Sequence, residues 1–111
     1  NEEWSSWASG VWSDIKETDT LTGYRAGRVE EDEKHIAPLQ LEVIRRCVRL
    51  WSNPGEVVFT PFAGIGSEVY VAIEQSRRGY GIELKPEYFK QAVENASAAV
   101  VRTHHQQRLA I

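Results

Sequence analysis

Residues 56–67 read EVVFTPFAGIGS, and the order of residue types in this stretch decides the fold. After the glutamate come β-branched and aromatic residues, which are typical of a strand. Their nearly continuous apolar character indicates burial on both faces, as in a parallel sheet. Gly64 and Gly66 then indicate a turn, and Ser67 is suited to cap a helix of about ten residues. The stretch therefore predicts a strand, a glycine turn and a helix in direct succession.

The flanking sequence predicts two further helices and a second strand. Upstream, apolar residues recur at helical spacing after Pro38 until residues 52–55, SNPG, end the helix. Downstream, residues 77–79, RRG, interrupt the chain before a second strand at residues 80–83, YGIE. A last helix begins at Pro86, and its apolar stripe comprises Phe89, Ala92, Val93, Ala96 and Val100. This order predicts an α/β fold in which a short parallel sheet, joined by a right-handed crossover, is flanked by helices.

The composition excludes several classes of protein. The chain has 111 residues, a formal net charge of −3 and one cysteine, so neither a disulfide framework nor a cysteine-based zinc cluster is expected. A single cysteine is typical of the reducing cytoplasm, and no apolar run is long enough to span a membrane. The chain contains no methionine, and two strands make a narrow sheet. We therefore expect a fragment of a longer protein.

The charge pattern divides the chain into three parts. An acidic leader is expected at residues 1–33, a patterned domain at 34–103 and a polar tail at 104–111. Three of the four tryptophans lie in this leader, namely Trp4, Trp7 and Trp12. We expect these rings to pack on the domain or on parts of the protein outside this chain. Base stacking and self-association remain the alternatives.

The first helix of the domain carries a separate set of expectations. Its apolar pattern predicts that Cys47 is buried as a small hydrophobic residue. Its polar face holds Arg45, Arg46 and Arg49. We expect these arginines to be solvated, with contact to DNA phosphates as the alternative in a complete enzyme.

The glycine turn and a later acidic residue form the candidate ligand site. Open α/β sheets bind ligands beyond the carboxyl ends of their strands, where Gly64 and Gly66 let the backbone approach a ligand closely. Glu83 lies 19 residues after Gly64, at the expected end of the second strand. A carboxylate there can accept hydrogen bonds from both hydroxyls of a ribose. The pair therefore indicates a cofactor that contains a nucleoside.

Two absences narrow the choice of cofactor. A dinucleotide fingerprint needs a small residue three positions after Gly66, and that position is Val69. The sequence also lacks the Gly-Lys-Ser/Thr ending of a phosphate-binding loop. S-adenosylmethionine has no phosphate and needs only close backbone approach and a ribose acceptor, so the residues favour this cofactor.

Three blocks of the sequence resemble the DNA methyltransferases that act on exocyclic amines. Residues 53–67, NPGEVVFTPFAGIGS, are similar to the strand and Asp-Pro-Phe-x-Gly-x-Gly signature of that family. Residues 80–89, YGIELKPEYF, are similar to its Gly-Ile-Glu strand and Pro-x-Tyr stretch. Residues 34–40, KHIAPLQ, are similar to a segment that closes over the methionine end of the cofactor. The blocks occur in the order of the family and cover about residues 34–95.

The resemblance implies part of a Rossmann-like methyltransferase fold, S-adenosyl-L-methionine as cofactor and a set of binding residues. By this resemblance the cofactor is held by a lid (His35, Ile36 and Pro38), a strand-end floor (Thr60 and Pro61), a backbone cradle (Phe62, Ala63, Gly64 and Gly66) and a ribose acceptor (Glu83). It assigns no catalytic residue and no metal ligand to this chain.

The sequence departs from the family in two ways. Thr60 stands where the family usually has aspartate, so the charge that would hold the methionine ammonium is missing. The four prolines are never adjacent. The catalytic Asp/Asn/Ser-Pro-Pro-aromatic motif, which binds the target amine and stacks on the flipped base, is therefore absent. In circularly permuted subgroups this motif precedes the cofactor-binding blocks, and the resemblance then implies that the chain is the C-terminal portion of such an enzyme.

The implied function is the cofactor-binding part of an enzyme that methylates N6 of adenine or N4 of cytosine in DNA, as in restriction-modification systems and phages. The partner of the complete enzyme is DNA, which this acidic chain is expected to bind weakly by itself. A missing N-terminal catalytic half or a second copy of the chain is a further expected partner, and no membrane is expected. The alternative is a non-catalytic methyltransferase-like subunit or an interaction scaffold.

Overall fold

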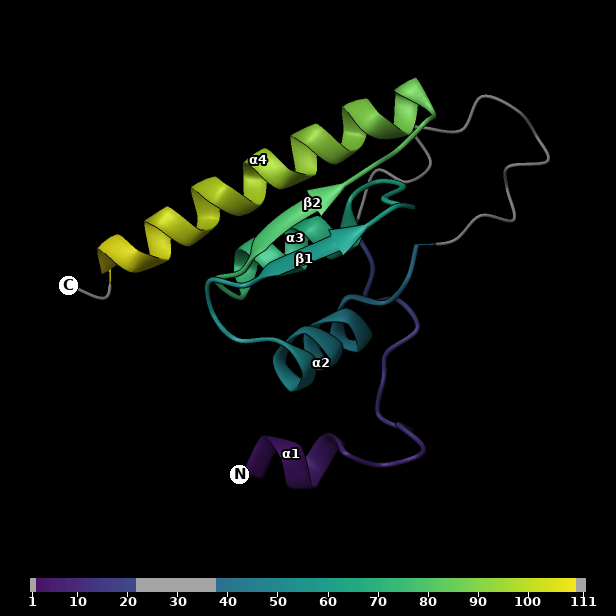
Figure 1. Ribbon diagram of the computed structural model, residues 1–111, viewed down its shortest axis with the longest axis vertical. Coiled ribbons are helices and arrows are strands. Elements are labelled where there is room, and N and C mark those ends of the chain that lie inside the picture. Colours follow the sequence, from purple (N-terminus) through teal and green to yellow (C-terminus); the bar gives the residue numbers. More distant parts are fainter. Residues whose placement is uncertain (1, 22–37, 110–111) are drawn as a thin grey trace.

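The computed structural model describes residues 2–21 and 38–109 of the chain (Figure 1). The elements of these residues are α1 (Glu2–Trp7), α2 (Leu41–Trp51), β1 (Val57–Thr60), α3 (Ser67–Glu74), β2 (Arg78–Gly81) and α4 (Pro86–Leu109). The order from α2 to α4 is the predicted one, and the α/β class is confirmed. Two elements differ from expectation, because the leader contains a short helix and α4 continues beyond residue 103, where a tail was expected.

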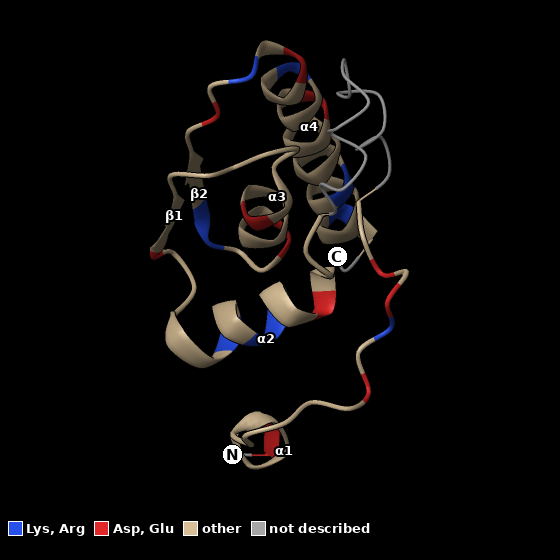
Figure 2. Ribbon diagram, turned by 90° about the vertical axis from the view of Figure 1, so that its right-hand side faces the viewer, with Lys and Arg blue, Asp and Glu red and all other residues tan. Residues whose placement is uncertain are grey.

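The two strands form a parallel sheet that is covered on one side. Val57 lies opposite Arg78 and Thr60 opposite Gly81, and α3 makes the crossover between the strands. Figure 2 shows the strands as one layer with α2, α3 and α4 all on the same side of it. In Figure 1, α2 lies beyond the β1 edge of the sheet and α4 beyond the β2 edge. The opposite face of the sheet carries no helix of the described residues.

The hydrophobic core lies between the sheet and these three helices. Val71 and Ala72 of α3 are fully buried, and Ile44 of α2 is 4% exposed. The buried cluster comprises Leu21, Leu41, Ile44, Val48, Ile65, Val71 and Tyr88. Helices α2, α3 and α4 and Leu21 of the leader therefore contribute to one core on one side of the sheet.

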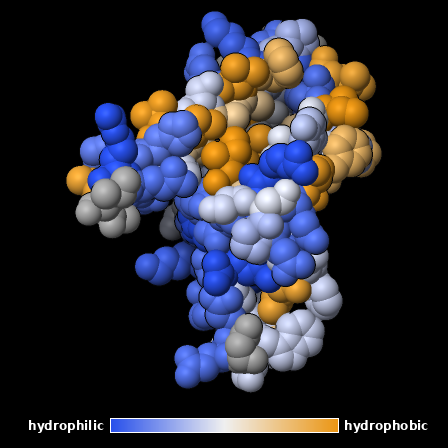
Figure 3. Space-filling model, turned by 60° about the vertical axis from the view of Figure 1, so that its left-hand side comes forward, coloured by the Kyte–Doolittle hydropathy of each residue, from blue (hydrophilic) through white to orange (hydrophobic). Residues whose placement is uncertain are grey.

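The other side of the sheet contradicts the prediction that β1 is buried on both faces. Val57 and Phe59 of β1 are 51% and 59% exposed, and Tyr80 of β2 is 56% exposed. Cys47, which we expected to be buried, is also exposed. Both predictions took apolar character as a sign of burial, but within the described residues no layer covers these side chains. Figure 3 shows hydrophobic side chains gathered on the surface of the upper part of the molecule, which holds the sheet.

The observed limits of three elements differ from those predicted. The second strand spans Arg78–Gly81 rather than residues 80–83, because the Arg78 N–H already donates to the Glu56 carbonyl and begins the ladder. Gly66, in a left-handed conformation, is the N-cap of α3, and Ser67 is its first helical residue. Helix α2 begins at Leu41, three residues after Pro38.

The start of α2 is fixed by the leader rather than by Pro38. The Leu41 N–H donates to the Asp19 carbonyl at 2.7 Å, and the Glu42 N–H donates to Asp19 Oδ2 at 3.0 Å. These two bonds satisfy N–H groups that have no partner within the helix. A residue more than twenty positions upstream therefore sets where the helix begins, and no local pattern around Pro38 reveals this.

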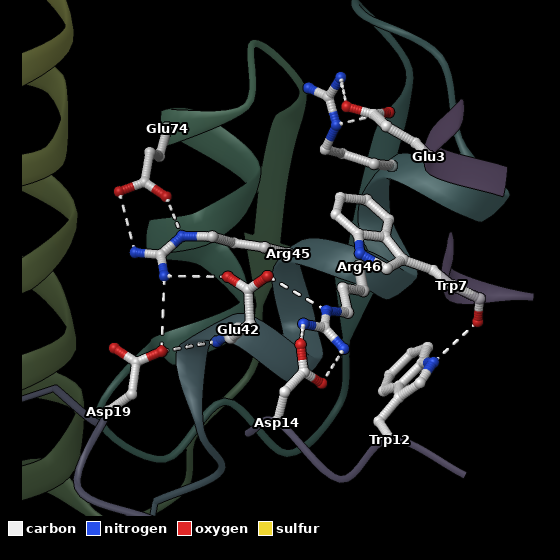
Figure 4. Close-up of polar contacts among 10 residues, drawn as sticks. Glu3, Trp7, Trp12, Asp14, Asp19, Glu42, Arg45, Arg46 and Glu74 are labelled. Carbon is white, nitrogen blue, oxygen red and sulfur yellow. Dashed lines mark hydrogen bonds and ion pairs between the residues drawn. The ribbon is translucent and has the colours of Figure 1, made fainter. Parts of the chain in front are cut away.

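Other residues of the described part of the leader pack along the polar side of α2 (Figure 4). Arg46 is only 6% exposed. Its guanidinium donates to both oxygens of Asp14 at 2.9 and 2.7 Å and to Glu42 at 3.1 Å. It also lies 5.5 Å from the ring centroid of Trp7 and 5.3 Å from that of Trp12. These contacts raise the pKa of Arg46 and lower that of Asp14, in both cases mainly through the hydrogen bonds that join them.

The other two arginines of α2 also have carboxylate partners. Arg45 donates to Glu74 of α3 at 2.7 Å, and Arg49 donates to Glu3 of α1. The prediction of a solvated arginine face was therefore wrong for Arg46, which the leader buries. The expectation that the tryptophans pack on the domain holds for Trp7 and Trp12, which contact Arg46, and for Trp4, which contacts Trp51.

Candidate cofactor-binding site

The glycine turn lies beyond the carboxyl end of β1, beside the end of β2. Gly64 and Gly66 have φ values of 55° and 87°, a region that favours glycine over residues with a Cβ. The Ala63 N–H donates to the Ile82 carbonyl at 2.9 Å, which fixes the turn to the segment after β2. A Cβ at Gly64 would meet nothing within 4 Å, so this residue leaves open space for a ligand.

Glu83 reaches this turn directly. The Gly64 N–H donates to Glu83 Oε2 at 2.8 Å, and the Lys85 N–H donates to Oε1 at 3.1 Å. An ionised carboxylate offers about two acceptor positions on each oxygen, so both oxygens can still accept further hydrogen bonds. The two backbone bonds therefore hold the carboxylate in a fixed orientation at the place where a ribose acceptor was predicted.

Thr60, the last residue of β1, bonds to the turn that follows it. The Phe62 N–H donates to Thr60 Oγ1 at 3.2 Å, a local hydrogen bond that serine and threonine form readily in turns. The Phe62 ring is 85% exposed and Pro61 is also exposed, whereas Ala63 is buried. The hydroxyl of Thr60 therefore shapes the turn without supplying the charge that an aspartate would bring.

Helix α4 packs against the glycine turn, and the sequence pattern did not predict this contact. Asn95 Nδ2 donates to the Ile65 carbonyl at 2.9 Å. A Cβ at Gly66 would lie only 3.1 Å from Cβ of Ala92, so glycine is needed here for packing as well as for its φ value. The one signal in the sequence was a polar asparagine among the alanines of the helix.

The close contact between α3 and β2 depends on glycines of the strand. A Cβ at Gly79 would lie 3.0 Å from Cα of Val69, and one at Gly81 would lie 3.1 Å from Cγ2 of the same valine. The small residue that dinucleotide-binding proteins place on the helix is therefore replaced by glycines in β2. This arrangement packs α3 tightly although its third position after Gly66 is a valine.

A small apolar recess adjoins Glu83 on the side of α4. It has a volume of about 130 Å³, and its lining includes Gly81, Phe89 and Val93. The recess lies next to the predicted ribose acceptor, so its apolar walls suit the face of a ring attached to that ribose.

The structure brings most of the described residues of the predicted site together. Thr60, the residues 61–66 and Glu83 come together in one place. Pro38 lies three residues before α2, and no hydrogen bond within the described residues joins it to the turn. The two other predicted lid residues, His35 and Ile36, lie outside the described residues. Within the described parts of the chain, no group of three or more suitable side chains could hold a metal ion.

A family of DNA methylases, of the N6 and N4 type, matches residues 1–94. The chain belongs to this DNA methylase family. The type II methyltransferase M.BglI of Bacillus subtilis is 30% identical over 95 residues, and M.Cfr9I of Citrobacter freundii is 33% identical over 89 residues. These matches cover 85% and 74% of this chain but only 24% and 30% of the two relatives. The chain therefore spans about a quarter to a third of their length.

The fold of this chain also matches a solved structure. TTHA0409 of Thermus thermophilus, complexed with S-adenosyl-L-methionine, superposes with a TM-score of 0.55 at 29% identity. The match covers 82% of this chain and 41% of TTHA0409. The predicted family and its Rossmann-like fold are confirmed, and S-adenosyl-L-methionine, the predicted cofactor, is the one bound in this relative.

Proposed function

We propose that this methylase chain is the C-terminal, cofactor-binding portion of a circularly permuted enzyme that methylates an exocyclic amine of DNA, N6 of adenine or N4 of cytosine. The observation that carries the proposal is the hydrogen bond between Glu83 and the Gly64 amide. This bond joins a nucleoside acceptor to a glycine turn at the shared carboxyl end of two parallel strands.

The residues at this end of the sheet fit S-adenosyl-L-methionine. Gly64 leaves space beside the backbone, and the Glu83 carboxylate is held by two backbone amides with acceptor positions to spare for ribose hydroxyls. The cofactor would supply the methyl group for transfer to the amine. This chain binds and orients it, and the residues that polarise the target amine come from outside this sequence, because the Pro-Pro-aromatic motif is absent from it.

The charges of the described residues support weak DNA binding by this portion alone. Arg45, Arg46 and Arg49 are each bonded to a carboxylate of the same chain, so their charge is largely neutralised. The formal net charge of the chain is −3. We therefore assign phosphate contacts to the rest of a cytoplasmic enzyme. No helix within the described residues is long and apolar enough to cross a membrane.

The alternative function, a scaffold that uses its tryptophans as an interface, has less support. Trp7 and Trp12 hold Arg46 between them, and Trp4 contacts Trp51 edge to face with 5.8 Å between ring centroids. These rings are occupied within the chain. A non-catalytic subunit that binds the cofactor for a separate catalytic chain remains compatible with the same site.

Calorimetric titration of S-adenosyl-L-methionine into the chain tests the proposal. We expect binding, and we expect Glu83→Ala to weaken it about ten- to a hundredfold, because a charge-assisted hydrogen bond contributes roughly 1.5–3 kcal/mol. Glu87→Ala is the matched control, since Glu87 is an exposed acid only four residues further along, in the first turn of α4.

Thermal unfolding of each variant separates loss of binding from loss of folding. A folded Glu83→Ala chain that binds as tightly as the original would contradict the assigned ribose contact. A folded original chain that takes up no cofactor at millimolar concentration would contradict the proposed function as a whole.

A further inference from the structure

Asn95 of α4 lies on the side of the helix that faces the domain. Tyr88, seven residues before it, and Ala99, four residues after it, are both buried. Positions with this spacing lie on one side of a helix. Such a position suits an apolar residue, and asparagine is a poor helix former. The residue type therefore needs a reason outside the helix, and the glycine turn of the candidate site provides one.

The side-chain amide of Asn95 is bonded at both of its polar atoms. Its Nδ2 donates to the Ile65 carbonyl at 2.9 Å, and its Oδ1 accepts a hydrogen bond from Gln91 Nε2 at 3.2 Å. The Ile65 carbonyl can only accept, so it requires the amide nitrogen of Asn95 on its side. Gln91 then satisfies the amide oxygen. The three groups form a chain of hydrogen bonds from α4 to the turn.

The peptide group that Asn95 binds lies inside the glycine turn. It consists of the Ile65 carbonyl and the Gly66 N–H, and this N–H donates to the Ala63 carbonyl at 2.8 Å. A Cβ at Gly66 would lie 3.1 Å from Cβ of Ala92, so α4 packs closely against the same peptide group. Rotation of this group would therefore break two hydrogen bonds, one of them made by Asn95.

The glycine turn needs restraint from outside because glycine itself provides none. Gly64 and Gly66 have positive φ values, which glycine adopts without strain, but glycine adopts many other conformations as readily. The Gly64 N–H donates to Glu83 at 2.8 Å, which restrains one part of the turn. The bond from Asn95 restrains the turn two peptide groups further along. A turn that already has its bound shape loses less conformational entropy when a ligand binds.

We propose that Asn95 is a positioning residue for S-adenosyl-L-methionine. It acts through the Ile65 carbonyl rather than by touching the cofactor. Its hydrogen bond keeps the glycine turn in the shape that places the Gly64 backbone and the Glu83 carboxylate beside the ribose. This inference rests on the proposed function and deepens it, because it adds a residue of α4 that controls how tightly the same site binds the cofactor.

The first test measures the turn without any cofactor. Hydrogen exchange of the Gly64 amide, followed by NMR in the full chain, reports its bond to Glu83. We expect Asn95→Leu, which has nearly the same shape but no donor, to speed this exchange about tenfold. The Gly55 amide is the control within the same molecule, because it donates to the Ser76 carbonyl at 2.9 Å in a turn before β1. Its exchange should not change.

The second test measures the cofactor by calorimetric titration. Asn95→Leu should bind S-adenosyl-L-methionine about five- to tenfold more weakly than the original chain. Asn95→Asp keeps the shape and polarity but lacks the donor, so it should bind equally weakly, and it gives the same measurement if leucine at this position disrupts folding. Asn95→Gln keeps the donor and should recover most of the loss. Gln106→Leu, at an exposed position near the end of α4, is the matched control and should bind normally.

A double substitution separates positioning from general stability. Glu83 and Asn95 hold the same turn, so either change alone releases it. The chain with both Glu83→Ala and Asn95→Leu should therefore lose less affinity than the product of the two single effects. A residue that only stabilised the fold would lower affinity independently of Glu83, and its effect would multiply with that of Glu83→Ala.

The contrary outcomes are equally specific. Unchanged exchange of the Gly64 amide in folded Asn95→Leu, unchanged cofactor affinity, effects that multiply in the double variant, or equal weakening by Gln106→Leu would each overturn the role of Asn95. When the original chain binds the cofactor and only these results fail, the positioning role fails and the proposed function stands. When the original chain takes up no cofactor, the proposed function fails and the positioning role fails with it.

Discussion

The two long sides of helix α2 differ in chemistry, one polar and one apolar, and they differ in how far their side chains are buried. On the polar side Arg46 is 6% exposed, held by Asp14 and enclosed by two indole rings. On the apolar side Trp51 is 73% exposed and Cys47 is also exposed. An isolated soluble domain usually has the reverse pattern, with apolar side chains inside and arginines in water.

This difference shows which side chains of α2 find partners within the described residues. The leader provides the carboxylates and rings that the arginines need, so the polar side of α2 is complete. On the apolar side Trp51 contacts Trp4, but Cys47 is exposed, and no strand of the described residues pairs with the edge of β1 opposite β2. Substitutions on the two sides of α2 should therefore have very different effects on the stability of the chain by itself.

The largest effect is expected at the buried ridge of α2 that faces the core. Ile44 is 4% exposed, and Ile44→Ala leaves a cavity that costs about 2–5 kcal/mol of unfolding free energy. Cys47→Ser, one turn away on the apolar side, should change the unfolding free energy by less than about 0.5 kcal/mol, because this side chain is exposed. Urea unfolding of both variants measures the contrast, and equal losses would mean that Cys47 is covered in solution.

The next largest effect is expected at the clamp between leader and helix. Arg46→Ala removes the hydrogen bonds to Asp14 and the contact with both rings, and leaves these groups without their partner. We expect the melting temperature to fall on the order of 5–10 °C and trypsin to cleave the leader at Lys16 several times faster. Arg108→Ala, in the exposed last turn of α4, is the control. Unchanged cleavage at Lys16 would argue against the clamp.

A smaller effect should depend on pH through Asp14. Its pKa lies below the ordinary value of 3.8, mainly because Arg46 donates to the carboxylate. A lowered pKa stabilises the folded chain above the unfolded value, and the stabilisation is lost as the pH falls through the folded pKa. Asp14→Asn should therefore lower the melting temperature by roughly 2–4 °C at pH 7, and the difference should shrink as the pH falls through the folded pKa of Asp14. A difference that stays constant as the pH falls would assign the loss to shape rather than charge.

The sequence predicted the parts of the fold and site that depend on local chemistry. The strand, the glycine turn and the acid 19 residues later were all located from residue types, because φ values above zero and parallel strand ends restrict which residues fit. Contacts between distant segments were not predictable in this way. Asp19 sets the start of α2, and Asn95 supports the turn, through pairings that no local pattern encodes.

Burial was the least predictable property, and Arg46 and Cys47 show why. A helical pattern gives the direction of each side chain but not the identity of what lies there. The pattern correctly placed the two residues on opposite sides of α2. It assumed that the apolar side faces the interior, an assumption that fails when a chain spans only a quarter to a third of its relatives.

The smallest predicted effect comes from Glu68, and its sign is opposite to that of Asp14. Glu68 lines a pocket between α2 and β1 beside Val43 and Val58, and partial burial raises its pKa above the ordinary value of 4.5. A raised carboxyl pKa means that the folded chain favours the protonated form, so stability present at low pH is lost as the pH rises through the folded pKa. Glu68→Gln should therefore raise the melting temperature by about 1–2 °C at pH 7 and leave it unchanged near about pH 3. Asp14 and Glu68 then respond to pH in opposite directions, because Asp14 has the cationic partner Arg46 and Glu68 is desolvated by partial burial.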